Sequence, residues 1–219
     1  MLAPAIPDNE TDRIASLRAL QILDTNPERR FDRITELTQQ VMGVPIAYIA
    51  MVDSDRQWFK SKCGLTTDQT GRDVSFCGHA ILSDSVMVVP DTLLDERFTD
   101  NPLVLEDPKI RFYAGQPLAG QNGHNVGTLC IADRLPRELQ EHELELLKLL
   151  GEMAQHELNL IDLIRTQKEL IDAKSMLIRV RQKQASELQE AAGYVRSLID
   201  PPITSGPIQT EWLFEASSD

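Results

Sequence analysis

The chain has 219 residues, of which 42% are hydrophobic and 26% charged, which excludes collagen, a disulfide scaffold and general disorder. Its formal net charge of −12 argues against a basic surface for nucleic acid. The longest apolar run, 44–52, contains Pro45 and is shorter than the about 20 residues of a membrane-spanning helix, so no membrane partner is expected. The first residues lack the pattern of a secretory signal, and a cytoplasmic location is predicted.

Three cysteines, Cys63, Cys77 and Cys130, are widely spaced along the chain. Because their number is odd and no export signal is predicted, a disulfide framework is not expected. No CxxC pair occurs, so no metal site is predicted either. We expect three reduced thiols that are mostly buried.

Two helices are predicted near the start, after a flexible lead-in over residues 1–9. Apolar residues at helical spacing predict the first helix from Glu10 to residue 23. Asn26 before Pro27 is typical of a helix start, and Gly43 is typical of a helix end. The second helix is therefore expected between these two signals.

Short apolar segments separated by turn sequences predict an antiparallel sheet in the middle of the chain. The turns at Asp53-Ser54-Asp55 and Asn122-Gly123 are typical of hairpins, while 75–82 is predicted as a short helix and 93–108 as a polar loop. The fold class is therefore α+β, with an antiparallel sheet flanked by helices. The predicted strands are 45–52, 57–62, 87–89, 111–118 and 125–132.

A long helix is predicted over residues 138–200, because leucine and isoleucine recur there and no proline occurs before Pro201. At about 1.5 Å per residue such a helix would be on the order of 90 Å long, too long to bury its apolar side against one small domain. We therefore expect a homodimer held by a parallel coiled coil over 138–200.

The heptad pattern of this helix is unusual. An isoleucine row and a leucine row lie side by side, whereas the opposite row is polar at Lys174 and Arg181. We interpret this as a signalling helix that can occupy two nearby rotations. An antiparallel pairing of its acidic and basic halves and a simple surface helix are the alternatives. The expected seam consists of Leu160, Leu163, Ile164, Leu170, Ile171, Lys174, Leu177, Ile178, Arg181, Leu188, Ala192, Val195 and Ile199.

Six blocks of sequence resemble GAF domains of bacterial signalling proteins, in their order and spacing. One of them is Ser75-Phe76-Cys77-Gly78-His79-Ala80-Ile81. The resemblance extends over about residues 10–160, and the sensor domain itself is assigned to 10–137. The six blocks are residues 18–25, 28–32, 52–60, 75–81, 111–115 and 127–130.

This resemblance implies a six-stranded antiparallel sheet with helices on one side and a pocket for an unidentified small molecule on the other. A domain used only for dimerisation or partner contact is the alternative. Arg111 is the one obvious cation for a phosphate-bearing ligand, unless it pairs with Asp91 or Asp107. The candidate pocket residues are Trp58, Phe76, Cys77, His79, Asp91, Arg111 and Tyr113.

Residues 191–202 and 210–218 resemble the entry of a PP2C-type (SpoIIE/RsbU-like) serine/threonine phosphatase domain. The resemblance implies that 201–219 begins a truncated phosphatase domain, in which Mg or Mn and a phosphoprotein substrate would bind. The fragment itself is expected to be non-catalytic, without cofactor and without catalytic or metal-binding residues. Because GAF domains also precede kinases and diguanylate cyclases, those outputs are alternatives.

A second alternative is an enzyme. The Cys77-Gly78-x-Ala80 segment also resembles free methionine sulfoxide reductases, which are single GAF domains that act through cysteine. These enzymes need a second cysteine, expected in the loop that here runs from residue 91 to 109, and none occurs in it. Cys63 would have to take that role.

Overall fold

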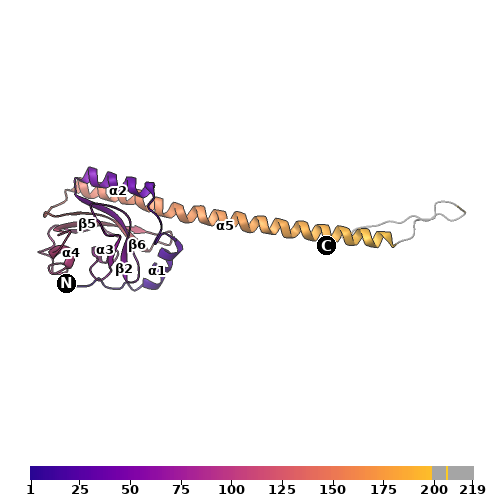
Figure 1. Ribbon diagram of the computed structural model, residues 1–219, viewed down its shortest axis with the longest axis horizontal. Helices are drawn as coiled ribbons and strands as arrows, with labels where there is room; N and C mark the ends of the chain where they lie inside the picture. Colours follow the sequence, from indigo (N-terminus) through magenta and orange to yellow (C-terminus); the bar gives the residue numbers. More distant parts are fainter. Residues whose placement is uncertain (199–205, 207–219) are drawn as a thin grey trace. The chain divides into compact units, whose positions relative to one another are not determined.

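A computed structural model describes residues 1–198 and Gly206, without the side chains of residues 161–165. The chain divides into two units, Met1–Arg165 and Thr166–Asp219, and each is described by itself. In the first unit, a six-stranded sheet has helices on both faces (Figure 1). The predicted α+β class is confirmed.

The sheet is antiparallel throughout, in the order β3-β2-β1-β6-β5-β4. Sequence patterns missed β3, because three residues with exposed or half-buried side chains carry no alternation. The strands are β1 Ile46–Val52, β2 Arg56–Cys63, β3 Gln69–Gly71, β4 Met87–Val89, β5 Phe112–Ala119 and β6 Asn125–Asp133.

Both predicted hairpins form. The N–H of Asp53 donates to the carbonyl of Arg56 at 2.8 Å and closes the turn between β1 and β2. Between β5 and β6, the N–H of Gly120 donates to the carbonyl of His124 at 3.0 Å. Gly123 has a φ of 77°, a conformation that glycine adopts readily and that explains the Asn-Gly signal.

Side chains on the two faces of the sheet form two separate hydrophobic clusters. On β1, Ala47, Ile49 and Met51 face one way, whereas Ile46 and Tyr48 face the other. The first set belongs to the helix-side cluster, which includes residues of α1 (Glu10–Ala19), α2 (Arg29–Met42) and α5 (Glu141–Ser197). The second set belongs to the α3-side cluster, built with α3 (Phe76–Ala80) and α4 (Pro102–Leu105).

Helix α2 and the beginning of α5 cover the sheet side by side (Figure 1). Contacts at their two ends show that the helices run antiparallel. Arg30 at the start of α2 pairs with Glu157, which lies further along α5, at 3.7 Å. At the other end, Arg137, which precedes α5, donates to the carbonyl of Met42 at 2.8 Å.

Two predicted helix boundaries are corrected by the backbone. Helix α1 ends at Ala19 and not at residue 23, since Gln21 and Asp24 have positive φ angles of 49° and 59°. Helix α2 starts at Arg29, because Glu28 before it is still extended, so Asn26-Pro27 is not its cap. Gly43 ends α2 with a φ of 61°, as predicted.

The first four residues of the expected flexible lead-in over residues 1–9 lie against the α3 side of the domain. The N–H of Leu2 donates to the carbonyl of Arg97 at 3.1 Å, and the Met1 ammonium pairs with Asp100. Pro4 is buried against Gly78, where an added Cβ would lie 2.6 Å from its Cγ atom. We call residues 1–7 the N-terminal strap.

The domain extends further than the predicted limit at residue 137. Four apolar residues near the start of α5 are at most 4% exposed in the helix-side cluster: Leu147, Leu150, Ala154 and Leu158. This part of the predicted signalling helix therefore belongs to the sensor domain, and the first unit ends at Arg165.

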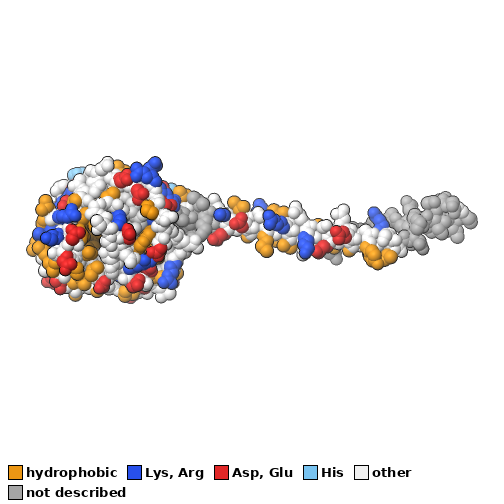
Figure 2. Space-filling view, viewed as in Figure 1, with side chains coloured by type: hydrophobic (Ala, Val, Ile, Leu, Met, Phe, Trp, Pro, Cys, Tyr) orange, Lys and Arg blue, Asp and Glu red, His pale blue; other side chains and the backbone are white. Residues whose placement is uncertain are grey.

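In the second unit, α5 continues as a helix to Ser197 and mixes hydrophobic with charged side chains (Figure 2). Of the expected seam, Ile199 and the side chains of Leu163 and Ile164 lie outside the described residues, as does 201–219 apart from Gly206. In the part of the chain that the structure describes, no helix is apolar enough over a sufficient length to cross a membrane. The seam residues with large exposed apolar side chains in this unit are Leu170, Ile171, Leu177, Ile178, Leu188 and Val195.

Replacement of Leu147 by alanine should lower the free energy of unfolding by about 2–5 kcal/mol, because it leaves a cavity under α5. Leu149→Ala is the matched control, because Leu149 lies on the same helix but is 50% exposed, and a loss below about 1 kcal/mol is expected. Urea unfolding of both variants measures the difference. Equal losses would contradict the packing of α5 against the sheet.

Candidate functional site

Three of the predicted pocket residues meet in the α3-side cluster. Phe76 and Cys77 come from α3 and Tyr113 from β5, and all three are at most 1% exposed. The ring of Phe76 stacks on Tyr113 at 5.0 Å between centroids and on Phe98 at 4.2 Å. Aromatic side chains therefore fill the space beside Cys77.

Trp58 lies on the other face of the sheet, in the helix-side cluster, and does not join these residues. Its ring lies 6.0 Å from the Lys60 ammonium, which also lies 5.5 Å from the ring of Phe31. Lys60 is buried and pairs with Glu28 at 2.6 Å. These contacts give Trp58 a packing role beside a buried cation.

Asp91 and Arg111 form an ion pair with each other, one of the two partners left open for this arginine. Arg111 donates from Nε and Nη2 to both carboxylate oxygens, at 2.8–3.0 Å. Hydrogen bonding from Arg111 lowers the pKa of the Asp91 carboxyl. The guanidinium is thus already occupied by a carboxylate and is not presented as a free cation for a phosphate.

His79 lies at the rim of the α3-side cluster. Its Nε2 atom is 3.0 Å from the carbonyl oxygen of Leu2 in the N-terminal strap, and its ring meets Phe98 edge-on at 5.1 Å. Burial lowers the pKa of His79. A neutral imidazole that donates from Nε2 to the carbonyl of Leu2 fits both observations.

Cys77 and Tyr113 belong to a polar group at the centre of the α3-side cluster, which we call the thiol–phenol group. The Sγ atoms of Cys77 and Cys130 are 3.5 Å apart, and the Tyr113 hydroxyl lies 3.1 Å from Cys130 and 3.6 Å from Cys77. Cys77 donates to the Tyr48 hydroxyl at 3.8 Å, and Cys130 to Thr128 at 2.9 Å. All five residues are at most 2% exposed.

The environment separates the acidities of the two thiols. Burial raises the pKa of Cys77, but hydrogen bonding with Cys130, Thr128, Tyr113 and Tyr48 outweighs burial and leaves it below its usual value. Burial and the neighbouring Cys77 raise the pKa of Cys130 well above its usual value.

Sequence reasoning missed Tyr48, Thr128 and Cys130. In the sheet, Tyr48 pairs with Cys130, which in turn pairs with Gly115. Gly115 makes room for Tyr113, because a Cβ there would lie 2.2 Å from the Tyr113 hydroxyl. The glycine two residues after this tyrosine was the one available signal that the ring lies along the strand.

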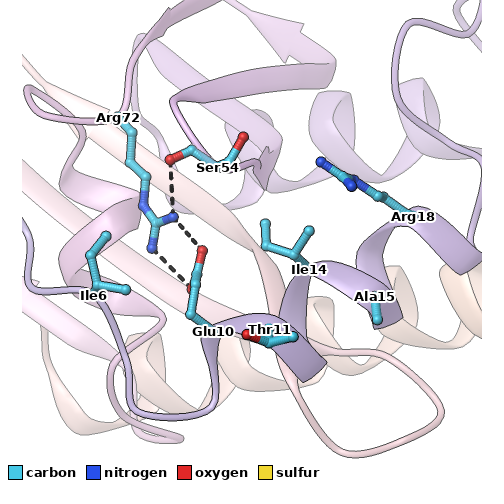
Figure 3. A pocket seen from close by; sticks show the side chains of 8 residues that line it. All are labelled: Ile6, Glu10, Thr11, Ile14, Ala15, Arg18, Ser54 and Arg72. Carbon is cyan, nitrogen blue, oxygen red and sulfur yellow. Dashed lines mark hydrogen bonds and ion pairs between the residues drawn. The ribbon is translucent and has the colours of Figure 1, made fainter.

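A separate pocket of about 590 Å³ opens beside α1 (Figure 3). Ile6 and Ile14 give it apolar walls, Arg18 lies on one side, and Arg72 and Glu10 face each other on another. Its volume suits a small molecule. It is lined by Ile6, Glu10, Thr11, Ile14, Ala15, Arg18, Ser54 and Arg72.

Glu10 is held between two arginines that are at most 5% exposed. Arg13 donates from Nε and Nη2 to its carboxylate at 2.8 Å each, and Arg72 donates from Nη1 at 2.5 Å. Burial raises the pKa of Glu10, but the two arginines lower it more, and it falls from 4.5 to about 2. The group ties α1 to the β1–β2 turn, because Arg13 also donates to the carbonyl of Val52.

Two polar side chains of α5 form hydrogen bonds with the backbone of the β5–β6 hairpin. The N–H of Ala119 donates to Gln155 at 2.8 Å, and Asn159 donates to the carbonyl of the same Ala119 at 3.3 Å. Gln121 adds a bond to the carbonyl of Asn159 at 3.1 Å. We call this arrangement the hairpin clamp; it acts where the strand register shifts, between Leu118 and Ala119.

No group of three or more His, Cys, Asp or Glu side chains suited to a metal ion occurs among the residues that the structure describes.

The Glu10 group predicts a pH-dependent stability. Because the folded pKa is about 2 and the ordinary value is 4.5, the carboxylate stabilises the fold above about pH 4.5, and this contribution is lost as the pH falls towards 2. Glu10→Gln should lower the free energy of unfolding by about 1–3 kcal/mol at pH 7. Urea unfolding across this pH range should show the penalty shrinking.

Glu36→Gln is the matched control. Glu36 pairs with Arg29 in the open, so its loss should cost about 0.5 kcal/mol or less. A Glu10→Gln penalty that stays constant down to pH 2 would contradict the assigned role of the carboxylate.

Comparison with known proteins places residues 26–158 in the GAF domain family. A cyclic di-GMP phosphodiesterase of Pseudomonas aeruginosa is 42% identical over 149 residues, which cover 68% of this chain and 25% of that protein. The chain thus spans about a quarter of this relative.

Two solved structures share the fold at 15% sequence identity each. The GAF domain of an Acinetobacter phosphoenolpyruvate-protein phosphotransferase superposes with a TM-score of 0.51, covering 69% of this chain and 93% of that one. The free methionine-R-sulfoxide reductase of Neisseria meningitidis, solved in complex with its substrate, superposes with a TM-score of 0.50. The match covers 74% of this chain and 96% of that one. Because the family model matches more than half of the chain, this protein belongs to the GAF domain family.

Proposed function

We propose that this chain senses a signal in its GAF domain and transmits it through α5 to an enzymatic domain that follows. The observation that carries this proposal is the hairpin clamp. It joins the end of β5 directly to α5, through both backbone groups of Ala119. A rearrangement of the β5–β6 hairpin therefore has to move α5 or break these bonds.

Transmission of this kind needs a partner for the exposed side of α5. Leu170, Ile171, Leu177 and Ile178 are 47–69% exposed in the single chain. Complete burial of a fully exposed side chain of this kind contributes about 1.5–3 kcal/mol, and this gain supports pairing with a second copy. We propose a parallel homodimer, because two sensors then deliver their signal to adjacent outputs.

Two nearby rotations of this paired helix are the proposed signalling states. The isoleucine row and the leucine row offer similar seams, and the polar Lys174 and Arg181 weaken the packing between them. A signal can shift an equilibrium only between states a few kcal/mol apart, and near-equal seams provide such a pair.

The proposed output is a PP2C-type serine/threonine phosphatase, supported by the resemblance of residues 191–202 and 210–218 to its entry. Mg or Mn and a phosphoprotein substrate would bind in that domain. Cyclic di-GMP hydrolysis is the second candidate, supported by the Pseudomonas aeruginosa relative. Phosphate release from a phosphoserine peptide and hydrolysis of cyclic di-GMP, both assayed on the full-length protein, distinguish the two.

Free methionine sulfoxide reduction is less well supported. Cys77 is 0% exposed, so its sulfur has no contact with the outside in the folded domain. Turnover of free methionine sulfoxide that is lost in Cys77→Ser would restore this alternative.

The dimer is tested by introducing charge on the seam. Ile171→Glu/Ile178→Glu should turn a dimer into a monomer in sedimentation equilibrium, because two buried charges per chain cannot be solvated. Ala173→Glu/Ser186→Glu adds the same charge to the same helix away from the expected seam, and this variant should stay dimeric. A monomeric wild type at high concentration would refute the homodimer.

The two-rotation hypothesis is tested by filling the polar row. Lys174→Leu/Arg181→Leu should tighten the dimer by about tenfold or more, since a gain of 1.4 kcal/mol already has that effect. The same variant should abolish the response of the output domain to its signal. An unchanged response would contradict the proposed rotation.

The hairpin clamp is tested with Gln155→Ala/Asn159→Ala. This variant should keep the dimer but uncouple it, so that output activity no longer depends on the state of the GAF domain. His156→Ala is the control, because His156 lies on the same stretch of α5 and is exposed. A variant that still responds like the wild type would show that the clamp carries no signal.

A further inference from the structure

The thiol–phenol group contains two cysteines that come from separate elements and meet inside the domain. Cys77 lies on α3 and Cys130 on β6, and their sulfur atoms are 3.5 Å apart as free thiols. A disulfide bond is about 2.05 Å long, so closing it needs an approach of about 1.5 Å. Cys77 belongs to a helix of five residues, an element short enough to make that movement.

We propose that Cys77 and Cys130 are a redox-active dithiol, which a small hydroperoxide converts reversibly into an intramolecular disulfide. This inference does not depend on the proposed output domain or on the dimer. It assigns chemistry to a buried group that the sensor and transmitter functions leave unused.

The surroundings of the two sulfur atoms favour this reaction over simple thiol packing. A cysteine in a purely apolar core is held as a neutral thiol, because burial disfavours the thiolate. Here the hydroxyl of Tyr113 lies within 3.6 Å of both sulfurs, and Thr128 lies 2.9 Å from Cys130. These groups can stabilise a negative charge on sulfur, and Cys77 has the lowered pKa of a nucleophile.

The reaction proceeds in two balanced steps. The Cys77 thiolate attacks one oxygen of hydrogen peroxide, so that an S–O bond forms, the O–O bond breaks and hydroxide leaves, giving a sulfenic acid. This hydroxide takes up the proton that the Cys77 thiol released, and becomes the first water. The Cys130 sulfur then attacks the Cys77 sulfur, forms the S–S bond and expels hydroxide, which takes up the proton of Cys130. Two thiols lose two electrons, and the peroxide is reduced to two molecules of water.

Access explains why the oxidant must be small. Both cysteines are 0% exposed, and the N-terminal strap packs Pro4 against Gly78, the residue after Cys77. Local opening of the strap and α3 admits a molecule the size of hydrogen peroxide more readily than a protein thiol. A large disulfide reagent should therefore react much more slowly.

Cys63 provides an internal comparison. It is partly exposed and lies on the α2 side of the sheet, where Thr35 is its hydrogen-bond partner. Burial and the carboxylates of Glu36 and Asp32 raise its pKa. If exposure to solvent alone decided the order of oxidation, Cys63 would be oxidised first. The proposal requires Cys77 and Cys130 to be oxidised before Cys63.

The test uses the full chain, reduced, freed of reductant and treated while folded with one equivalent of hydrogen peroxide. Remaining thiols are alkylated after denaturation and mapped by mass spectrometry. We expect a chain lighter by two hydrogen atoms before alkylation, a linked peptide pair that contains Cys77 and Cys130, and alkylation of Cys63 alone. Dithiothreitol should restore three alkylated cysteines.

Alkylation of both Cys77 and Cys130 after peroxide treatment would overturn the proposal, as would a disulfide that contains Cys63 or a sulfinic acid on Cys77 beside a free Cys130. Cys63→Ser is the matched control and should form the same disulfide at the same rate. Peptide mapping of the wild type decides the question, so the result does not depend on whether a variant of the buried cysteines folds.

The hydroxyl of Tyr113 has a positioning role in this reaction. Tyr113→Phe removes a hydroxyl that lies within 3.6 Å of both sulfurs, and it should slow disulfide formation by about tenfold, as expected for one lost hydrogen bond. The pH profile of the oxidation rate should shift to higher pH at the same time. An unchanged rate and profile would show that the phenol only packs.

Discussion

Strands β1 and β6 lie at the centre of the sheet and bury side chains on both faces, so each face must be covered by a further layer. One layer is α2 with the first part of α5. The other is α3, α4 and the loops around them. The helix that leaves the sensor domain is therefore part of its core, and the thiol–phenol group is sealed inside the opposite face.

The elements were largely predictable because their signals are local. Asn122-Gly123, Gly43 and the apolar run of β1 act over a few residues, and the structure has a turn, a helix end and a strand at these places. The start of α2 is not predicted correctly. Asn26 before Pro27 is typical of a helix start, but the backbone is still extended at Glu28 and the helix begins at Arg29. The sequence predicts the domain limit at residue 137, whereas α5 packs in the helix-side cluster as far as Leu158, because an apolar helix face does not reveal whether a sheet or a second chain covers it.

The site could be predicted only in part, because it depends on strand register and on which face each side chain takes. Trp58 and Phe59 are both buried, so alternation along β2 cannot decide which one faces α3. Cys77 and Cys130 are separated by 53 positions, and no local pattern links them. The helix-side position of Trp58 and the meeting of the two thiols are properties of the assembled sheet.

The β5–β6 hairpin connects the two features that bear on function. Tyr113 and Cys130, on paired strands, hold the thiol–phenol group at one end, while Ala119 is held by α5 at the other. A disulfide bond at Cys130 and a change in the packing of α5 against Ala119 would thus both act on strands β5 and β6. We regard this hairpin as the element whose two arrangements would have to differ between signalling states.

Gly115 has a consequence for reading related sequences. The Tyr113 ring lies along β5 because no side chain stands at position 115. A side chain at position 115 would force the Tyr113 ring to shift, because a Cβ there would lie 2.2 Å from the hydroxyl. It would thereby displace the hydroxyl that now lies 3.1 Å from Cys130 and 3.6 Å from Cys77, so the absence of a side chain at this one position permits the contact between phenol and thiols.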